Sequence, residues 1–264
     1  MFIDTHCHLD FKQFDADRNE VIKRAQQAGV SHIINVGVDI RGSKASVELA
    51  KQYDNIFATV GIHPHYAQEV KQEDIQIIEG LTEYDKIVAI GEIGLDYFDH
   101  QKPEVIIEKS FRLKQQNVLL KFIDLAIRKD LPIIFHCRNA ADDLLSIIAE
   151  NIKKEDSAVI HCFSQSKEFL RACLDKGMYV SFTANITYKK SENLRELITY
   201  VPLDRFFLET DAPYLTWQGK RGQRNESSFI PFLAEEIAWI KKIGVNELAQ
   251  ITTNNAKNFF KINF

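Results

Sequence analysis

The 264-residue sequence has little of what special architectures require. It contains 11 Gly and 6 Pro, far too few for a collagen-like or low-complexity chain. Its 4 cysteines are too few for a disulfide framework in a chain of this length, and Cys7, Cys137 and Cys162 each directly follow a histidine. We therefore interpret the cysteines as reduced thiols.

Long apolar runs, a signal segment and an excess of basic charge are also absent. No apolar run reaches the roughly 18 residues of a membrane-spanning helix. The opening residues MFIDTH place an acid and a histidine where a signal peptide is apolar. With 33 basic and 37 acidic residues, the net charge of -4 gives no general field for holding a long nucleic acid. These absences predict a cytoplasmic protein with no membrane partner and only local contacts to any nucleic acid.

Short apolar segments alternate along the chain with segments of helical period. The expected strands are Phe2–His6, His32–Val38, Ile56–Gly61, Ile87–Glu92, Pro132–Cys137, Ala158–Cys162, Met178–Phe182 and Phe206–Leu208. Eight such units in about 250 residues predict an α/β protein, a (β/α)8 TIM barrel forming a single hydrolase domain over residues 1–264. Two further helical segments follow, 229–242 and 246–260, and we expect one extra helix to pack on the barrel exterior.

Polar residues stand where these strands end, which is the end of a barrel that carries chemistry. Six of them form a candidate set of metal ligands: His6, His8, Glu92, His136, His161 and Asp211. Because strand side chains alternate between faces, His6 and His8 point the same way and Cys7 points the opposite way. The same alternation directs Cys137 and Cys162 toward the helices, so we interpret the cysteines as small buried hydrophobes rather than ligands.

Four imidazoles and two carboxylates exceed the needs of one four-coordinate ion. They suit two divalent cations that share a bridging carboxylate, for which Glu92 is the candidate. A ligand set without thiolate fits Mg, Mn or Zn, and the sequence does not choose among them. Asp4 and Glu209 share the alternation of the ligands and are candidates for orienting them by hydrogen bonds. His32 stands at the start of its strand, at the other end of the barrel, and we interpret it as structural.

The candidate ligands and their neighbours form six motifs in chain order, of which all but the second contain a candidate ligand: DTHCHLD at 4–10, GIHPH at 61–65, GEIGLDY at 91–97, HCR at 136–138, HCFS at 161–164 and ETDAPYL at 209–215. With RGQRNE at 221–226 and a terminal TTNNAKNFF, the chain resembles the TatD-type metal-dependent deoxyribonucleases of the amidohydrolase superfamily over essentially its whole length. The sequence departs from that family's pattern at Asn139, Gln165 and Ser227, where we expect an effect on substrate preference rather than on hydrolysis.

The resemblance implies one metal held by His6, His8, Glu92 and Asp211, and a second held by Glu92, His136 and His161. It implies a hydrolase of phosphodiester bonds, first of all a 3′-5′ exodeoxyribonuclease acting on single-stranded DNA or DNA ends, with RNA as a second candidate substrate. The candidate catalytic residues are Asp211, as the base, and Glu92. The candidate substrate contacts are His63, His65, Arg138, Arg221, Arg224 and Tyr97.

Two other classes of function stay open. Another binuclear amidohydrolase, acting on a small ester, an amide or an aminoacyl-tRNA, would use a similar ligand set. Many of those enzymes carry a carbamylated lysine where this chain has Glu92, which argues against that class. A protein that binds nucleic acid without turnover would lack a ligand or nucleophile position, and no such gap is visible. The sequence does not set the oligomeric state, and a monomer is compatible with it.

Overall fold

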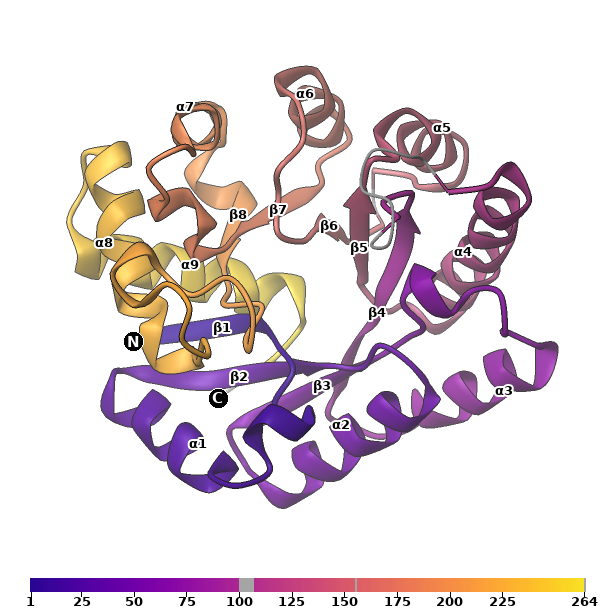
Figure 1. Ribbon diagram of the computed structural model, residues 1–264, viewed down its shortest axis with the longest axis horizontal. Coiled ribbons are helices and arrows are strands. Elements are labelled where there is room, and N and C mark those ends of the chain that lie inside the picture. The colour runs from indigo at the N-terminus through magenta and orange to yellow at the C-terminus, as the bar shows by residue number, and fades with distance from the viewer. Residues whose placement is uncertain (100–106, 155, 264) are drawn as a thin grey trace.

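Eight parallel strands surrounded by helices make up the fold (Figure 1). The computed structural model describes residues 1–99, 107–154 and 156–263. Its strands are β1 (Phe2–Cys7), β2 (Val30–Val36), β3 (Ile56–Val60), β4 (Ile87–Asp96), β5 (Ile133–Arg138), β6 (Ala158–Ile160), β7 (Tyr179–Phe182) and β8 (Phe206–Leu208). They pair in chain order from β1 to β8, always in parallel. The predicted (β/α)8 barrel is confirmed.

A helix fills each connection between consecutive strands. The helices are α1 (Arg18–Gln27), α2 (Ile40–Gln52), α3 (Gln72–Leu81), α4 (Lys109–Lys129), α5 (Ala141–Asn151), α6 (Lys167–Asp175) and α7 (Glu192–Tyr200), followed after β8 by α8 (Ile230–Lys241) and α9 (Val245–Phe259).

The last helix closes the barrel interior. Phe259 and Phe260 pack with Phe207 of β8, with ring centroids 5.1 and 5.7 Å apart, in a cluster that also contains Ile34 and Ile134. The expectation that the extra helix lies on the barrel exterior is therefore wrong. Large aromatic side chains at the end of α9 fill the inner space that the strand residues leave open.

The joint between the first strand and the segment after the last one brings distant residues together. The backbone N–H of His8 donates to the carbonyl of Ala212 at 2.8 Å, and that of Asp211 donates to the carbonyl of His6 at 2.8 Å. The largest departures from the expected strand lengths are in β4, which continues past Glu92 to Asp96, and in β6, which ends at Ile160. In the described part of the chain, no helix is long and apolar enough to cross a membrane.

Candidate metal centre

The six predicted ligands meet around one carboxylate at the carboxyl ends of the strands. Three of them lie in strands: His6 in β1, Glu92 in β4 and His136 in β5. The other three lie just after strands: His8 after β1, His161 after β6 and Asp211 after β8. Glu92 is 3% exposed and lies at the centre, with its two oxygens facing two separate groups of donor atoms. The structure thus brings together residues up to 205 positions apart in sequence.

The first donor group surrounds Glu92 Oε2. Its distance is 3.3 Å to His6 Nε2 and 4.0 Å to His8 Nε2, while Asp211 Oδ1 lies 3.9 Å from His6 Nε2 and 3.4 Å from His8 Nε2. Ligands about 2.0–2.1 Å from a tetrahedral ion are separated from each other by about 3.3 Å. The spacing of these four atoms is therefore close to what a divalent cation requires.

The buried ring of His6 supplies a second reason to place a cation in the first donor group. Within the described residues, neither ring nitrogen of His6 has a hydrogen-bond partner, although the residue is 0% exposed. A buried polar atom without a partner costs about 1–3 kcal/mol. A metal ion at the first donor group would satisfy His6 Nε2 and remove that cost.

The second donor group surrounds the other oxygen of the same carboxylate. Glu92 Oε1 lies 2.7 Å from His136 Nδ1 and 2.8 Å from His161 Nε2, and these two nitrogens are 3.2 Å apart. The three atoms come from neighbouring strands β4, β5 and the end of β6. Glu92 is thus the shared member of both donor groups, which is the arrangement of a bridging carboxylate.

The charges of the cluster stabilise its ionised carboxylates. Burial disfavours ionisation of Glu92, but His161 and then His63 outweigh burial and hold the pKa of Glu92 well below its usual range. Burial opposes the charged form of His8, but its hydrogen bond to Asp211 and the charges of Asp211 and Glu92 outweigh burial and raise the pKa of His8 to about 9. Protons therefore occupy part of the cluster at neutral pH, and entry of a cation must release them.

A hydrogen bond on the far side of the His8 ring selects its tautomer. His8 Nδ1 lies 2.9 Å from the carbonyl of Val36, so that nitrogen carries the proton and leaves Nε2 free as a ligand. His161 Nδ1 lies 3.5 Å from Glu209 Oε1, so Glu209 contacts a candidate ligand as expected. Asp4 instead accepts hydrogen bonds from the backbone and hydroxyl of Thr210, at 2.9 and 2.6 Å.

A cavity of about 580 Å³ opens over the cluster. Three of the predicted substrate contacts line it: His63, His65 and Arg138. His63 Nδ1 accepts from the backbone N–H of His65 at 3.2 Å, so the neutral ring carries its proton on Nε2, which lies 3.6 Å from Glu92 Oε1. Burial, and then the charge of His136, lower the pKa of His63 well below its usual range. His63 is therefore a neutral hydrogen-bond donor beside the second donor group.

The other three predicted substrate contacts do not line this cavity. Tyr97 is 3% exposed, and its hydroxyl donates to Asp143 at 2.7 Å, so its ring is not available for stacking. Arg224 forms hydrogen bonds of 2.7 and 2.8 Å with Asp17. Arg221 lies over the ring of Tyr188, 4.5 Å from its centroid. These side chains are committed to local packing and ion pairs, and their assignment to the site is not supported.

Residues that the sequence analysis missed also line the cavity. They are the aromatic residues Phe11, Tyr66 and Tyr214, together with Ser164, Asn185 and Cys162. The expectation that Cys162 faces the helices is wrong, because β6 ends two residues earlier and its alternation no longer applies. Tyr66 and Tyr214 are 43% and 50% exposed. Tyr66 directly follows His65, and Tyr214 lies three residues after Asp211. Their closeness to these motif residues is the signal that could have identified them.

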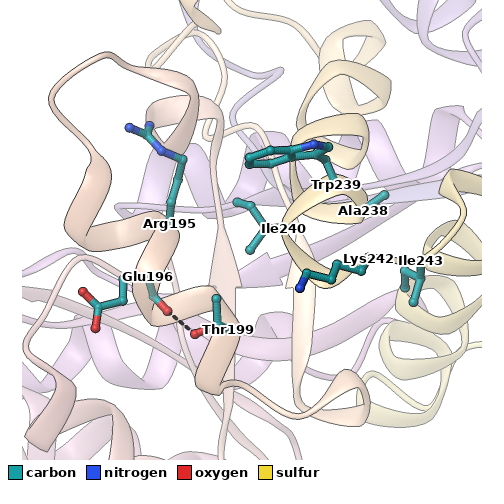
Figure 2. A pocket seen from close by; sticks show the side chains of 8 residues that line it. All are labelled: Arg195, Glu196, Thr199, Ala238, Trp239, Ile240, Lys242 and Ile243. Carbon is teal, nitrogen blue, oxygen red and sulfur yellow. Dashed lines mark hydrogen bonds between the residues drawn. The ribbon is translucent and has the colours of Figure 1, made fainter.

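A second hollow, of about 630 Å³, lies on the outside of the barrel between α7 and α8 (Figure 2). Two of its polar side chains are used by the fold. The hydroxyl of Thr199 donates to the carbonyl of Glu196 at 2.6 Å, and Arg195 donates to the carbonyls of Ile186 and Tyr188 at 2.6 and 2.8 Å. The hollow contains none of the candidate ligands, so we place the chemistry in the cavity over Glu92.

A parallel eight-stranded barrel with imidazoles and carboxylates gathered at its strand ends defines the class of metal-dependent barrel hydrolases. The model of the TatD related DNase family matches residues 3–261, and the chain belongs to this family. The predicted class of enzyme, a metal-dependent hydrolase, is confirmed.

Relatives of known sequence and structure agree with this assignment. The chain is 39% identical over 263 residues to the "Uncharacterized metal-dependent hydrolase YabD" of Bacillus subtilis, covering 100% of both chains. It is 35% identical over 266 residues to the 3′-5′ ssDNA/RNA exonuclease TatD of Erwinia tasmaniensis, covering 98% of this chain and 99% of the relative. The crystal structure of YjjV, a TatD homologue from Escherichia coli K12, is 31% identical with a TM-score of 0.90, covering 99% and 98% of the two chains.

Proposed function

We propose that the protein binds two divalent cations and hydrolyses phosphodiester bonds, removing nucleotides from the 3′ end of single-stranded DNA. One observation carries the proposal: the two oxygens of Glu92 face two donor groups, which have His6, His8 and Asp211 on one side and His136 and His161 on the other. One relative is named as an exonuclease of single-stranded DNA and RNA, so RNA is a second candidate substrate.

Two divalent cations, when bound, would supply Lewis acidity and a nucleophilic water at neutral pH, and Mg, Mn and Zn all fit the donor types. Asp211 is the candidate base, because 16% of its side chain is exposed toward the cavity, compared with 4% for Glu92. Burial disfavours its ionisation, but the hydrogen bond from His8 and nearby charges outweigh burial and lower the pKa of Asp211. It is therefore ionised at neutral pH and able to accept a proton from water.

The chain's other cavity residues suit a phosphodiester. His63 would donate its Nε2 proton in a hydrogen bond to a non-bridging phosphoryl oxygen, and Arg138, held over the ring of Phe98 at 3.6 Å, would pair with phosphate charge. Attack by the water oxygen forms one P–O bond and breaks the bond from phosphorus to the 3′ oxygen. The proton accepted by Asp211 then passes to that 3′ oxygen, and a 5′-nucleotide leaves.

The charge of the molecule favours short or terminal substrates. A net charge of -4 provides no long basic track, whereas one or two phosphates can be held by a few local cations.

All 4 cysteines are free, which suits a reducing compartment, and we assign the protein to the cytoplasm.

Digestion of a 5′-labelled single-stranded oligonucleotide tests the proposed function. Protein stripped with chelator is assayed with Mg²⁺, Mn²⁺ or Zn²⁺, on DNA and on RNA of the same sequence. We expect a metal-dependent ladder that shortens from the 3′ end. Asp211→Asn should slow cleavage by about 10²–10⁴-fold, because it removes a base and a ligand charge. The matched control is Asp85→Asn, an exposed carboxylate in the turn before β4, which should cleave at the wild-type rate.

The outcomes distinguish the rivals. Wild-type protein that binds two ions per chain and cleaves neither nucleic acid would contradict the proposal and favour a small ester or amide substrate. Release of the labelled terminal nucleotide as the first product would reverse the polarity. Equal cleavage by Asp211→Asn would remove Asp211 from the role of base.

A further inference from the structure

A carboxylate outside the predicted ligand set lies directly behind the second donor group. Asp96 is the last residue of β4 and is 1% exposed. Its Oδ2 accepts hydrogen bonds from His136 Nε2 at 3.1 Å and from His65 Nε2 at 2.9 Å. Its Oδ1 accepts the backbone N–H of Phe98 at 2.9 Å. Both oxygens of Asp96 are therefore used by donors whose positions the fold sets.

The backbone of Asp96 is held as firmly as its side chain. Gln115 of α4, itself 1% exposed, accepts the N–H of Asp96 at 2.9 Å and donates to its carbonyl at 2.9 Å. This pair of bonds ties the end of β4 to α4. With the backbone held, the carboxylate of Asp96 cannot turn away from His136 without losing the hydrogen bond that Oδ1 accepts from Phe98.

An ionised carboxylate only accepts hydrogen bonds, so it determines the proton position on its neighbour. Asp96 Oδ1 accepts the N–H of Phe98, and Oδ2 lies between His136 Nε2 and His65 Nε2, at 3.1 and 2.9 Å, so the carboxylate presents an acceptor to both rings. A cation held by Glu92 Oε1, His136 Nδ1 and His161 Nε2 would take the lone pair of His136 Nδ1. The neutral ring would then carry its proton on Nε2, which faces Asp96 Oδ2 at 3.1 Å.

We infer that Asp96 is a positioning residue of the metal centre, which selects the tautomer of His136 that binds the second cation through Nδ1. The inference rests on the proposed two-metal function. A carboxylate that orients a ligating imidazole in this way also makes the imidazole a stronger ligand. Because His65 shares Asp96 Oδ2, the rim of the cavity and the second donor group are joined through one oxygen atom.

The same residues could instead be considered as a cation site of their own. Suitable atoms of His63, His65 and Asp96 lie within 4.8 Å of one another. However, His63 Nδ1 already accepts the N–H of His65, which leaves the proton on Nε2. Asp96 Oδ2 already accepts two N–H groups. These proton positions favour a hydrogen-bonded relay behind His136 over a third cation.

Asp96→Asn tests the inference with little change of shape. The N–H of Phe98 requires an acceptor at Oδ1, so the new NH2 group takes the Oδ2 position and faces two imidazole nitrogens. His136 must then accept on Nε2 and carry its proton on Nδ1, which blocks the second donor group. We expect calorimetric titration of chelated protein with Mn²⁺ to show the second ion bound 10–100-fold more weakly, with the first ion unchanged. On the oligonucleotide, kcat should fall by a similar factor while KM is unchanged.

Asp143→Asn is the matched control. Asp143 also accepts two side-chain hydrogen bonds, from Tyr97 at 2.7 Å and Gln116 at 2.8 Å, but it contacts none of the candidate ligands. This variant should bind both ions as the wild type does. If Asp96→Asn also binds both ions with wild-type affinities, the inference is wrong.

A measurement on the wild type keeps the inference testable if Asp96→Asn does not fold. Imidazole ¹⁵N shifts of the zinc-loaded protein should show the metal on Nδ1 and the proton on Nε2 of His136. Metal on Nε2 would overturn the inference. Failure of the proposed function has a different signature, because a wild-type protein that binds fewer than two ions or cleaves no nucleic acid fails before any variant is compared.

Discussion

At the scale of single residues, the hydrogen-bond partner of Nδ1 determines whether a histidine of the site can act as a metal ligand or as a hydrogen-bond donor through Nε2. The carbonyl of Val36 places the proton of His8 on Nδ1, whereas the backbone N–H of His65 places that of His63 on Nε2. His8 is thereby prepared as a ligand and His63 as a donor. Backbone groups supplied by β2 and by the turn after β3 make this distinction.

His32 of β2 gives a prediction about pH. It lies away from the metal centre, with its ring 5.9 Å from that of Phe57. Burial, followed by Lys257 and Lys86, lowers the pKa of His32 from 6.5 to about 4. The unfolded chain therefore binds more protons than the folded one between these pH values, so the stability present above pH 6.5 is lost as the pH falls toward 4.

Urea unfolding of chelated protein near neutral and near pH 5 measures this loss. We expect wild type to lose about 1 kcal/mol more than His32→Gln over that interval, after allowance for solvent screening at this half-buried site. Equal losses in the two proteins, or a wild type that becomes relatively more stable in acid, would contradict the assignment.

At the scale of elements, β4 does most to organise the centre. Glu92, Gly94 and Asp96 alternate along it, and Gly94 pairs with His136 of β5. A side chain at Gly94 has no room, since its Cβ would lie 2.0 Å from the carbonyl oxygen of His136, and its φ of +152° is one that other residues rarely adopt. The segment IGLD at 93–96 gives only a weak strand signal because it contains a glycine and ends in an aspartate, which is why β4 was predicted to end at Glu92.

Gly94→Ala should therefore separate β4 from β5. We expect a loss of at least about 1–3 kcal/mol of unfolding free energy from overpacking, together with weaker metal binding, because Glu92 and His136 move apart. The control is Gly80→Ala in α3, where a Cβ meets nothing within 4 Å. That variant should gain roughly 0.5–1 kcal/mol from reduced backbone freedom in a helix. Wild-type stability and metal affinity in Gly94→Ala would show that the strands adjust without cost.

At the scale of the whole molecule, the centre exists only when the barrel is closed. The bonds from His8 to Ala212 and from Asp211 to His6 join the two ends of the sheet and complete the first donor group. Neither half of the chain contains that group. Binding of cations is therefore coupled to folding of the entire barrel.

Metal removal should lower the thermal stability of the protein. Ions at about 100 times their Kd stabilise a folded state by about 2.7 kcal/mol. For a chain of this size that corresponds to roughly 5–10 °C in Tm. Differential scanning calorimetry of chelated protein, before and after addition of Mn²⁺ or Zn²⁺, measures the shift. Glu92→Gln, which removes the shared carboxylate charge, should show little response to either ion, and an unresponsive wild type would argue against a metal centre.

Features that depend on the alternation of side chains along a strand could be predicted from the sequence. Strand period placed His6 with His8 and directed Glu92 inward, and the order of the units predicted the barrel. These inferences hold because an extended strand leaves each side chain only two directions.

The tertiary structure decided what depends on distant partners. It buried Tyr97 against Asp143 and paired Arg224 with Asp17, although both were predicted to contact substrate. It also brought Asp96 behind His136. Long or terminal side chains reach partners that sequence spacing does not fix, so their roles follow from which groups the closed barrel places beside them.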